Sequence, residues 1–286
     1  MKTKLLCVCL SFFSLAQSQA QSQVKEGKIT YERTITFQQR NRNNNNNPDA
    51  DNRPRSRTDR FELSFSATQS LWESLPDMNA GGDEAGGGGG GNFGGGGGMR
   101  FFGAMGGDDL SYVNFASGRK VDQRELAQKT YIVEDSIQKL KWKLTGESQT
   151  ILGYKAQMAT AEQYLTRTRP VMENGEMKMQ EVQDTSRIIA WFTPQIPVPA
   201  GPSYPGQLPG LILQLEINNG RMVYKAVEFS PKVNVNSIKE PKGGKRISAA
   251  DYAKENQKVM EEMRRNFQGG RGIRMNAGGG GGGRNN

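Results

Sequence analysis

The side chains that most often carry out catalysis are missing or misplaced in this sequence. Its 286 residues include no histidine, and its only two cysteines are Cys7 and Cys9. Without histidine, Ser-His-Asp and Cys-His catalysis and the usual imidazole metal sites are excluded. An enzyme built from this chain would need paired carboxylates, a lysine, or an activated serine or threonine.

The acidic pairs Glu134-Asp135 and Glu261-Glu262 are the candidates for acid–base chemistry. Neighbouring residues project in different directions, so we interpret both pairs as solvated surface. We expect neither a Gly-x-Ser-x-Gly nor a Ser-x-x-Lys catalytic constellation. We therefore expect a protein that is not an enzyme and that has no catalytic residue and no cofactor. An enzyme that uses carboxylates in a cleft is the alternative.

Metal binding has one candidate region, which combines acids with two methionines: Asp83, Glu84, Met99, Met105, Asp108 and Asp109. Carboxylates could hold calcium and thioethers could hold Cu(I). The spacing matches no calcium loop, and the methionines lack Met-x-x-Met clustering. We expect no metal site here and interpret these residues as keeping a glycine-rich loop soluble, with weak metal binding as an alternative.

The first twenty residues are typical of a cleavable signal peptide. Lys2 and Lys4 precede an apolar run from Leu5 to Leu15, and Ser18-Gln19-Ala20 is an acceptable cleavage site. The run is shorter than the roughly 20 apolar residues that span a bilayer, and no later segment is long and apolar enough to cross a membrane. We expect an exported protein that is periplasmic, outer-membrane-associated or secreted, and whose mature chain has lost both cysteines.

Glycine and arginine could bind phosphate or nucleic acid. Gly86–Gly98 lacks the strand, the glycine spacing and the Lys-Ser/Thr helix of a phosphate loop. The net charge is +9, and the sequence Gly-Gly-Arg-Gly at 269–272 is similar to segments that bind single strands. Much of the excess charge lies in 40–60 and 264–286, and nucleic acid is not the usual partner of an exported protein, so we expect none.

Low-complexity segments divide the chain. Of the 36 glycines, 16 lie in 81–107 and 9 lie in 269–283, and asparagine fills 43–47. Such segments carry too little apolar surface to offset the entropy of ordering them. We predict one domain over 24–268, with disordered insertions at about 39–57 and 77–107 and a disordered tail at 269–286.

Apolar residues elsewhere alternate with polar ones, which is typical of antiparallel strands with one buried face. The alternating sets are Ile29, Tyr31, Ile35 and Phe37; Phe61, Leu63 and Phe65; Leu140, Trp142 and Leu144; and Leu211, Leu213, Leu215 and Ile217. The segment Ile188–Phe192 is apolar throughout and is expected to be covered on both faces, whereas 167–184 is polar and is expected to be an excursion with little strand. The sequence predicts a mainly β fold, a curved antiparallel sheet or half-barrel of about seven to ten strands.

Two local signals complete this fold. Asn219-Gly220 between alternating runs predicts a tight hairpin, because both residues tolerate positive φ. Ser248, with Asp251 three residues on, predicts the start of one C-terminal helix that covers part of the sheet. Its apolar positions recur at helical spacing: Tyr252, Val259, Met263 and Phe267.

The stretch from Ala190 to Leu213 is the most distinctive part of the sequence. It reads as a strand, a crossing stiffened by five prolines, and a type II turn at Pro209-Gly210 that leads into the next strand. In order, Ala-Trp-Phe-Thr, Ile-Pro, Gly-Pro and Leu-Pro-Gly-Leu-Ile-Leu resemble the GLPGLI family of exported proteins from Gram-negative bacteria. The motif residues are Gly206, Leu208, Pro209, Gly210, Leu211 and Ile212, with Gln207 in place of the family's first glycine. The resemblance implies no activity.

Binding of a partner is therefore the favoured class of function. By analogy with half-barrel carriers, we expect a non-enzymatic envelope protein that assists an outer-membrane β-barrel protein or carries a lipid-like ligand. A purely structural surface component is the third possibility. The oligomeric state is left open.

Overall fold

A single curved sheet forms the body of the protein in the computed structural model, which describes residues 24–37, 55–76, 110–173 and 176–272. The twelve strands lie in the order β12-β6-β5-β4-β3-β2-β1-β11-β10-β9-β8-β7. They are β1 (Gly27–Phe37), β2 (Arg55–Phe65), β3 (Gln69–Ser74), β4 (Leu110–Asn114), β5 (Arg119–Leu126), β6 (Lys129–Ser136), β7 (Lys143–Ile151), β8 (Tyr154–Glu173), β9 (Glu176–Thr193), β10 (Leu211–Ile217), β11 (Met222–Ser230) and β12 (Lys245–Ser248). The mainly β prediction is confirmed, but twelve strands exceed the seven to ten expected.

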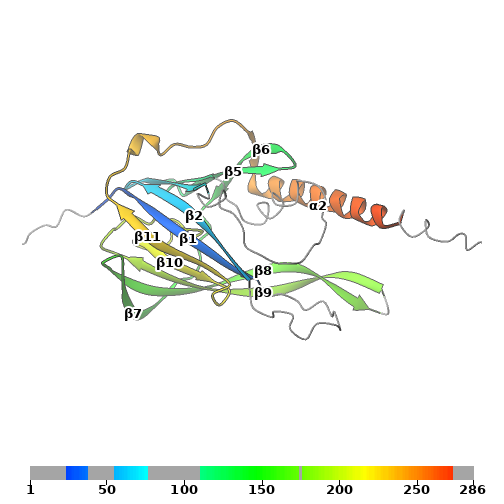
Figure 1. Ribbon diagram of the computed structural model, residues 1–286, viewed down its shortest axis with the longest axis horizontal. Helices are drawn as coiled ribbons and strands as arrows, with labels where there is room; N and C mark the ends of the chain where they lie inside the picture. The colour runs from blue at the N-terminus through cyan, green and yellow to red at the C-terminus, as the bar shows by residue number, and fades with distance from the viewer. Residues whose placement is uncertain (1–23, 38–54, 77–109, 174–175, 273–286) are drawn as a thin grey trace, which may run out of the picture.

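Neighbouring strands are antiparallel except β12, which pairs with β6 in parallel. Figure 1 shows β5 and β6 at one end of the curve, β7, β8 and β9 at the other, and β1, β2, β10 and β11 between them. The main core lies between these ends, where Tyr31, Phe65 and Phe192 are almost fully buried. The Tyr31 hydroxyl donates to the Ile212 carbonyl oxygen at 2.5 Å, and burial raises its pKa.

The segment between β9 and β10 fills this core instead of crossing over its surface. Ile196, Val198 and Ala200 are each at most 1% exposed, which is the period-two burial of an extended chain. Its carbonyls accept hydrogen bonds from β10, from Leu211 N to Ile196 O (3.0 Å) and from Ile212 N to Ala200 O (2.9 Å). The prolines therefore shape a plug of the core, here called the core plug (residues 194–210).

The predicted type II turn at Pro209-Gly210 is wrong. Gly210 does not have positive φ, and its N–H donates to the Leu208 carbonyl oxygen at 2.9 Å, which closes a three-residue turn centred on Pro209. Glycine is required for space: a Cβ at this position would lie 2.2 Å from the Thr193 carbonyl oxygen. The backbone of Gly210 lies so close to that of Thr193 that only glycine fits at this position, and the sequence does not show this contact directly.

The hairpin prediction at Asn219-Gly220 is confirmed. These residues join β10 to β11 with φ of 55° and 77°, and Arg221 N donates to the Asn218 carbonyl oxygen at 3.2 Å. Positive φ at both central positions is the geometry of the tight hairpin turn that Asn-Gly favours.

The expectation of an excursion with little strand over 167–184 is wrong. β8 and β9 stay paired from Gln157↔Phe192 to Glu173↔Glu176, and Figure 1 shows their far end projecting beyond the sheet. Within this projection Tyr164 and Met172 are each 70% exposed. The described side chains beyond Glu162↔Arg187 are exposed or half-buried, except Ser186, and this segment has no apolar alternation, so the sequence pattern could not reveal its strands.

The expected strand over Leu140, Trp142 and Leu144 is partly wrong. β7 begins at Lys143, and Leu140 and Trp142 lie in the β6–β7 connection, packed against the main core. Leu144 is 60% exposed. At Ile188–Phe192 one face is buried, whereas Ile189 and Trp191 on the other face are only half-buried.

The outer face of β3–β6 is covered by the chain that follows β11. Ile238, just after the 3₁₀ turn η1 (Val235–Ser237), packs with Leu71, Tyr112 and Val121. Arg119 and Arg246 each pair with both Glu134 and Glu240, which ties this chain to β5, β6 and β12. Both carboxyls have lowered pKa values because the two guanidinium groups donate to them.

The helix α2 (Ala249–Gly272) begins as predicted. Ser248 Oγ accepts from Asp251 N at 3.1 Å and lies 2.8 Å from an Asp251 carboxylate oxygen. Tyr252 is buried against Tyr131 with their rings edge to face, while Met263 is 38% exposed. Val259, further along the helix, packs against the same cluster as Tyr252, so the helix covers this part of the sheet at least as far as Val259. Within the described ranges no helix is long and apolar enough to cross a membrane.

Several sequence predictions fall outside the described residues. These are the signal peptide at 1–20, the acids and methionines between 83 and 109, most of the insertions at 39–57 and 77–107, and most of the tail at 269–286. At two margins the structure does describe the chain: β2 begins at Arg55, inside the first segment, and α2 continues to Gly272.

Candidate functional site

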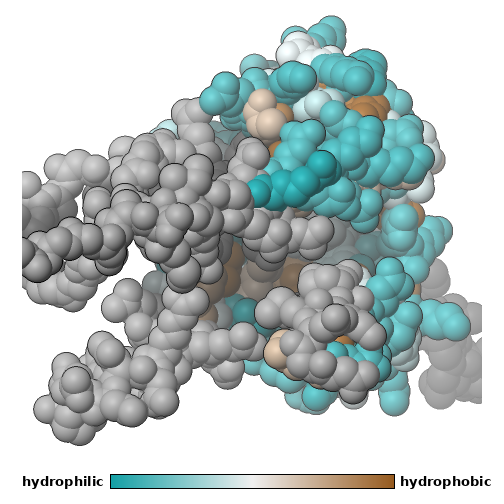
Figure 2. Space-filling view, turned by 90° about the vertical axis from the view of Figure 1, so that its right-hand side faces the viewer, coloured by the Kyte–Doolittle hydropathy of each residue, from teal (hydrophilic) through white to brown (hydrophobic). Residues whose placement is uncertain are grey.

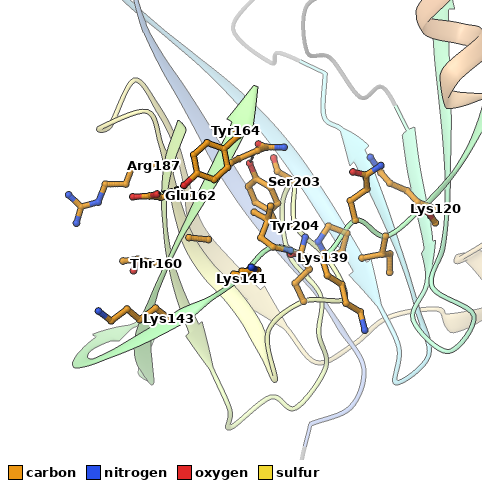
Figure 3. A pocket seen from close by; sticks show the side chains of 18 of the residues that line it. Lys120, Lys139, Lys141, Lys143, Thr160, Glu162, Tyr164, Arg187, Ser203 and Tyr204 are labelled. Carbon is orange, nitrogen blue, oxygen red and sulfur yellow. Dashed lines mark hydrogen bonds between the residues drawn. The ribbon is translucent and has the colours of Figure 1, made fainter. Parts of the chain in front are cut away.

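A wide groove opens where the two ends of the sheet face each other. Its volume is about 1080 Å³. It is lined by the end of β6, the β6–β7 connection, residues 160–164 of β8 and residues 203–205 and 207 of the core plug, with single residues from β5, β7 and β9. In Figure 3, Thr160, Glu162 and Tyr164 follow one strand, Lys120 lies on the opposite side, and Tyr204, Lys139 and Lys141 lie between them. We call this the cationic groove.

Lysines and one arginine give the groove its charge. Its lining holds five cations, Lys120, Lys139, Lys141, Lys143 and Arg187, against the two carboxylates of Asp135 and Glu162. The formal surplus is therefore three positive charges. Four of these cations, all except Lys120, are exposed, and none of the four forms an ion pair within the described ranges. Exposed lysines are common, but their convergence on one concavity raises the local concentration of anions.

Lys120 differs because its charge is already engaged. Its ammonium lies 3.0 Å from the buried carboxylate of Asp122, which Arg124 also contacts at 2.8 Å. Burial alone would raise the pKa of Asp122, but the two cations and a hydrogen bond from Ser111 lower it overall. Lys120 therefore helps to stabilise the β4–β5 region, and the other four cations are the ones available to a ligand.

Gln207 builds one wall of the groove. Its Oε1 accepts from the Leu140 backbone N–H (2.9 Å) and from Trp142 Nε1 (3.0 Å), which fixes the β6–β7 connection against the core plug. The sequence analysis treated Gln207 only as a departure from the family's glycine. An amide in place of glycine was nevertheless a usable signal, since a half-buried amide needs hydrogen-bond partners.

Tyr204 joins the same wall to β8. Its hydroxyl donates to Gln163 Oε1 at 3.0 Å, and its ring packs edge to face on Trp142 with centroids 6.0 Å apart. Burial, with a smaller effect of Tyr224, raises the pKa of Tyr204 to about 12. The phenol is therefore neutral at physiological pH and acts as a hydrogen-bond donor.

The six family-motif residues lie next to the groove and do not line it. Gly206 has φ of 76°, and a Cβ there would lie 2.5 Å from Ile137 Cδ1, so this glycine lets the wall come close. Leu208, Leu211 and Ile212 are buried in the main core, and Pro209 is exposed. Their positions are those of structural residues, with Gln207 between them facing the groove.

The candidate acids are not gathered into an acid–base pair. Glu134 is held by Arg119 and Arg246, Asp135 lines the groove, and Glu261 and Glu262 are exposed on α2. Glu73 lies opposite Glu62 on neighbouring strands, and burial together with that charge raises its pKa, but neither residue lines the groove. In the parts of the chain that the structure describes, no group of three or more acids could hold a metal ion.

The sequence analysis expects no Ser-x-x-Lys constellation, but the sequence has two such spacings, Ser117 to Lys120 and Ser136 to Lys139. Lys120, Ser136 and Lys139 line the groove. Such a spacing serves catalysis when a helix turns both side chains to one side. Ser136 ends β6 and Lys139 follows it in the connection, so neither pair lies on a helix. No hydrogen bond joins either pair among the described residues.

A family model matches one part of the chain that includes one side of this site. Residues 142–214 match the model of a family described as "Protein of unknown function (Porph_ging)". The predicted resemblance is confirmed over that stretch. It contains the motif at 206–212, the core plug, β8, β9 and one side of the groove.

Other comparisons give no activity. No curated protein matches the chain. Two solved structures described as PNGF-II, in P21 and C2 space groups, align with TM-scores of 0.46 and 0.47 at 16% identity. The alignments cover 82% of this chain and 34% and 33% of the PNGF-II chains, so this chain spans about one third of their length.

Proposed function

We propose that the protein is an exported, non-enzymatic binding protein whose cationic groove takes an acidic segment of a partner protein in the cell envelope. The observation that carries the proposal is the convergence of Lys139, Lys141, Lys143 and Arg187 on one groove, exposed and without ionic partners among the described residues. Cations left unpaired in a concave surface attract and orient an anionic partner. Of the two partners that the sequence analysis leaves open, an outer-membrane β-barrel protein and a lipid-like ligand, the protein is the one proposed here.

A protein partner is favoured over a lipid-like cargo because the interior is filled. Ile196, Val198 and Ala200 of the core plug occupy the place that an apolar ligand would need in a half-barrel. Figure 2 shows a mainly hydrophilic face, with hydrophobic residues in the hollow between its upper and lower parts and at a few separate places outside it. The export signal is the reason to favour protein over nucleic acid, and the absence of histidine is the reason to favour binding over catalysis.

We further propose that the family domain extends over 24–268, beyond the matched stretch. Strands β1, β2 and β3 lie in the same sheet as β8–β11. Tyr31, Phe61 and Trp72 share the main core with Phe192 and Leu215. A core that both parts complete is typical of one domain.

The test compares two triple charge reversals of the mature protein. K139E/K141E/K143E changes the groove, and K232E/K239E/K242E changes three lysines that are exposed elsewhere. Each is cross-linked in intact envelopes, and the captured proteins are identified by mass spectrometry. We expect the wild type and the control to capture one acidic envelope protein that the groove variant loses. Equal capture by all three, or capture of lipid alone, would contradict the proposal.

A further inference from the structure

Strand β8 loses one of its two neighbours inside the cationic groove. β7 pairs with β8 from Ile151↔Tyr154 to Lys143↔Thr160 and goes no further. On its other side β8 continues to pair with β9 as far as Glu173. From Ala161 onward, the described strands therefore leave the β7 side of β8 as an open sheet edge.

The open edge presents backbone hydrogen-bonding groups in a known alternation. Thr145 Oγ1 of β7 donates to the Met158 carbonyl oxygen, so Met158 turns its backbone groups toward β7. Because successive residues of a strand alternate, Thr160, Glu162, Tyr164 and Thr166 do the same, and Ala161 turns toward β9. Arg187 supports this register from the far side, since its carbonyl accepts from Asn218 and faces away from β8.

This edge lies in the groove, with room and charge beside it. Ala161, Glu162, Gln163 and Tyr164 all line the groove, whose volume is about 1080 Å³. Lys139 and Lys141 belong to the connection that precedes β7, and Figure 3 shows both set apart from the strand that carries Glu162 and Tyr164. A strand added at 161–166 would extend for roughly 20 Å at about 3.3 Å per residue.

We propose that the partner binds by strand addition: an extended acidic peptide segment pairs with β8 at Ala161–Thr166, antiparallel, in the place that β7 leaves at Lys143. Main-chain hydrogen bonds to Glu162, Tyr164 and Thr166 hold the segment, and Lys139, Lys141 and Lys143 select its acidic side chains. This inference rests on the proposed function of the groove and specifies its mode of recognition.

The first test uses two synthetic peptides and the purified mature protein. One peptide is an eight-residue alternation of glutamate and threonine capped at both ends, and the other has the same sequence with every backbone N–H methylated, so that neither edge of the strand can donate. Fluorescence anisotropy measures the two dissociation constants. We expect the methylated peptide to bind about tenfold more weakly or worse, since it loses the backbone donors that would pair with β8.

Three other results of this test have distinct meanings. Equal binding of both peptides would overturn strand addition while leaving an acidic ligand in the groove. Binding of neither would overturn the proposed function as well. If inorganic polyphosphate displaces the unmethylated peptide and binds as tightly as it does, the groove recognises negative charge alone and strand addition is wrong.

The second test changes the protein at one position. Tyr164→Pro removes a backbone donor that faces the groove, and proline is tolerated at a strand edge that pairs on its other side. Tyr164→Ala removes the same side chain and keeps the donor. We expect the proline variant to bind the unmethylated peptide about tenfold more weakly than the alanine variant. Equal affinities, with circular dichroism showing both variants folded, would contradict the proposal.

A second copy of the chain is the other possible occupant of the edge. Sedimentation of the wild type and of Tyr164→Pro across protein concentrations tests it. We expect the same mass for both. A wild-type dimer that the peptide dissociates, and that Tyr164→Pro does not form, would assign the edge to self-association and overturn the proposal.

Discussion

The β8–β9 hairpin is paired without interruption along its length, but the side chains of its two halves differ in burial. Near the body of the protein, Ala159, Ala190 and Phe192 are at most 1% exposed and pack against the core plug. Beyond Glu162↔Arg187 the same two strands continue with Tyr164 and Met172 each 70% exposed. Backbone pairing therefore runs the length of the hairpin, while side-chain packing stabilises only its base.

The base of the hairpin contributes to the stability of the fold, whereas the projecting half is available for binding a partner. The base has strand neighbours on both sides, whereas the projecting half has open edges in the described part of the chain. A segment that contributes little to the core is free to contact a partner. The comparison predicts large losses of stability for changes at the base and small ones for changes beyond it.

Phe192→Ala should give the largest effect. This side chain is 1% exposed in the main core, and removing a buried phenylalanine costs about 3–5 kcal/mol. Denaturant unfolding followed by circular dichroism measures the loss. A loss below about 1 kcal/mol would mean that the base of the hairpin is not a packed core.

Gly210→Ala tests the junction of the core plug with the base of the hairpin. The new Cβ would lie 2.2 Å from the Thr193 carbonyl oxygen, so we expect a loss of about 2–3 kcal/mol. Gly146→Ala is the matched control: Gly146 has φ of 85° and open space around its Cα, so only backbone strain of about 1 kcal/mol should appear. Similar losses for the two variants would argue against close backbone approach at Gly210.

Gln207→Ala should loosen the groove wall at a smaller cost. It removes one acceptor shared by Leu140 N and Trp142 Nε1, and we expect a loss of about 1–2 kcal/mol. Tryptophan fluorescence should shift as the Trp142 ring becomes more hydrated. Gln207→Glu, which keeps an acceptor, should lose less stability, and an equal loss would contradict the hydrogen-bond assignment.

Tyr204→Phe should change how the free energy of unfolding depends on pH above about pH 10. The folded pKa of Tyr204 is raised to about 12, so the folded state holds this proton more tightly than the unfolded chain, where the pKa is about 10. The resulting stabilisation is present below pH 10 and is lost as the pH rises toward 12. We expect the variant to lose less stability than the wild type across this window in unfolding measurements. Identical pH profiles would place the phenol in solvent.

Tyr164→Ala, beyond the base of the hairpin, should give the smallest effect. The side chain is 70% exposed, and its hydroxyl donates to Glu162 Oε2 at 3.1 Å. We expect a change in unfolding free energy within about 0.5 kcal/mol. A loss comparable to that of Phe192→Ala would erase the distinction between the two halves.

Periodicity predicted the parts of the fold in which one face is buried. The runs at 29–37, 61–65 and 211–217 became β1, β2 and β10, and Asn219-Gly220 and Ser248 marked a hairpin and a helix start. The projecting half of β8–β9 was not predicted, because strands held by backbone pairing alone show no hydrophobic pattern in the sequence. The groove could not be predicted from the sequence, because the order of the strands brings its lining residues together and no local pattern encodes that order. These residues include Lys139, Tyr164, Arg187 and Gln207.

The most direct test of the groove's role is a titration of the capped glutamate–threonine peptide into three purified proteins at low and high salt. These are the wild type, K139E/K141E/K143E and K232E/K239E/K242E. We expect the wild type and the control to bind alike, the groove variant to bind at least tenfold more weakly, and salt to weaken binding by the first two. Equal binding by all three proteins, or binding that salt does not affect, would contradict a cationic groove that recognises an acidic partner.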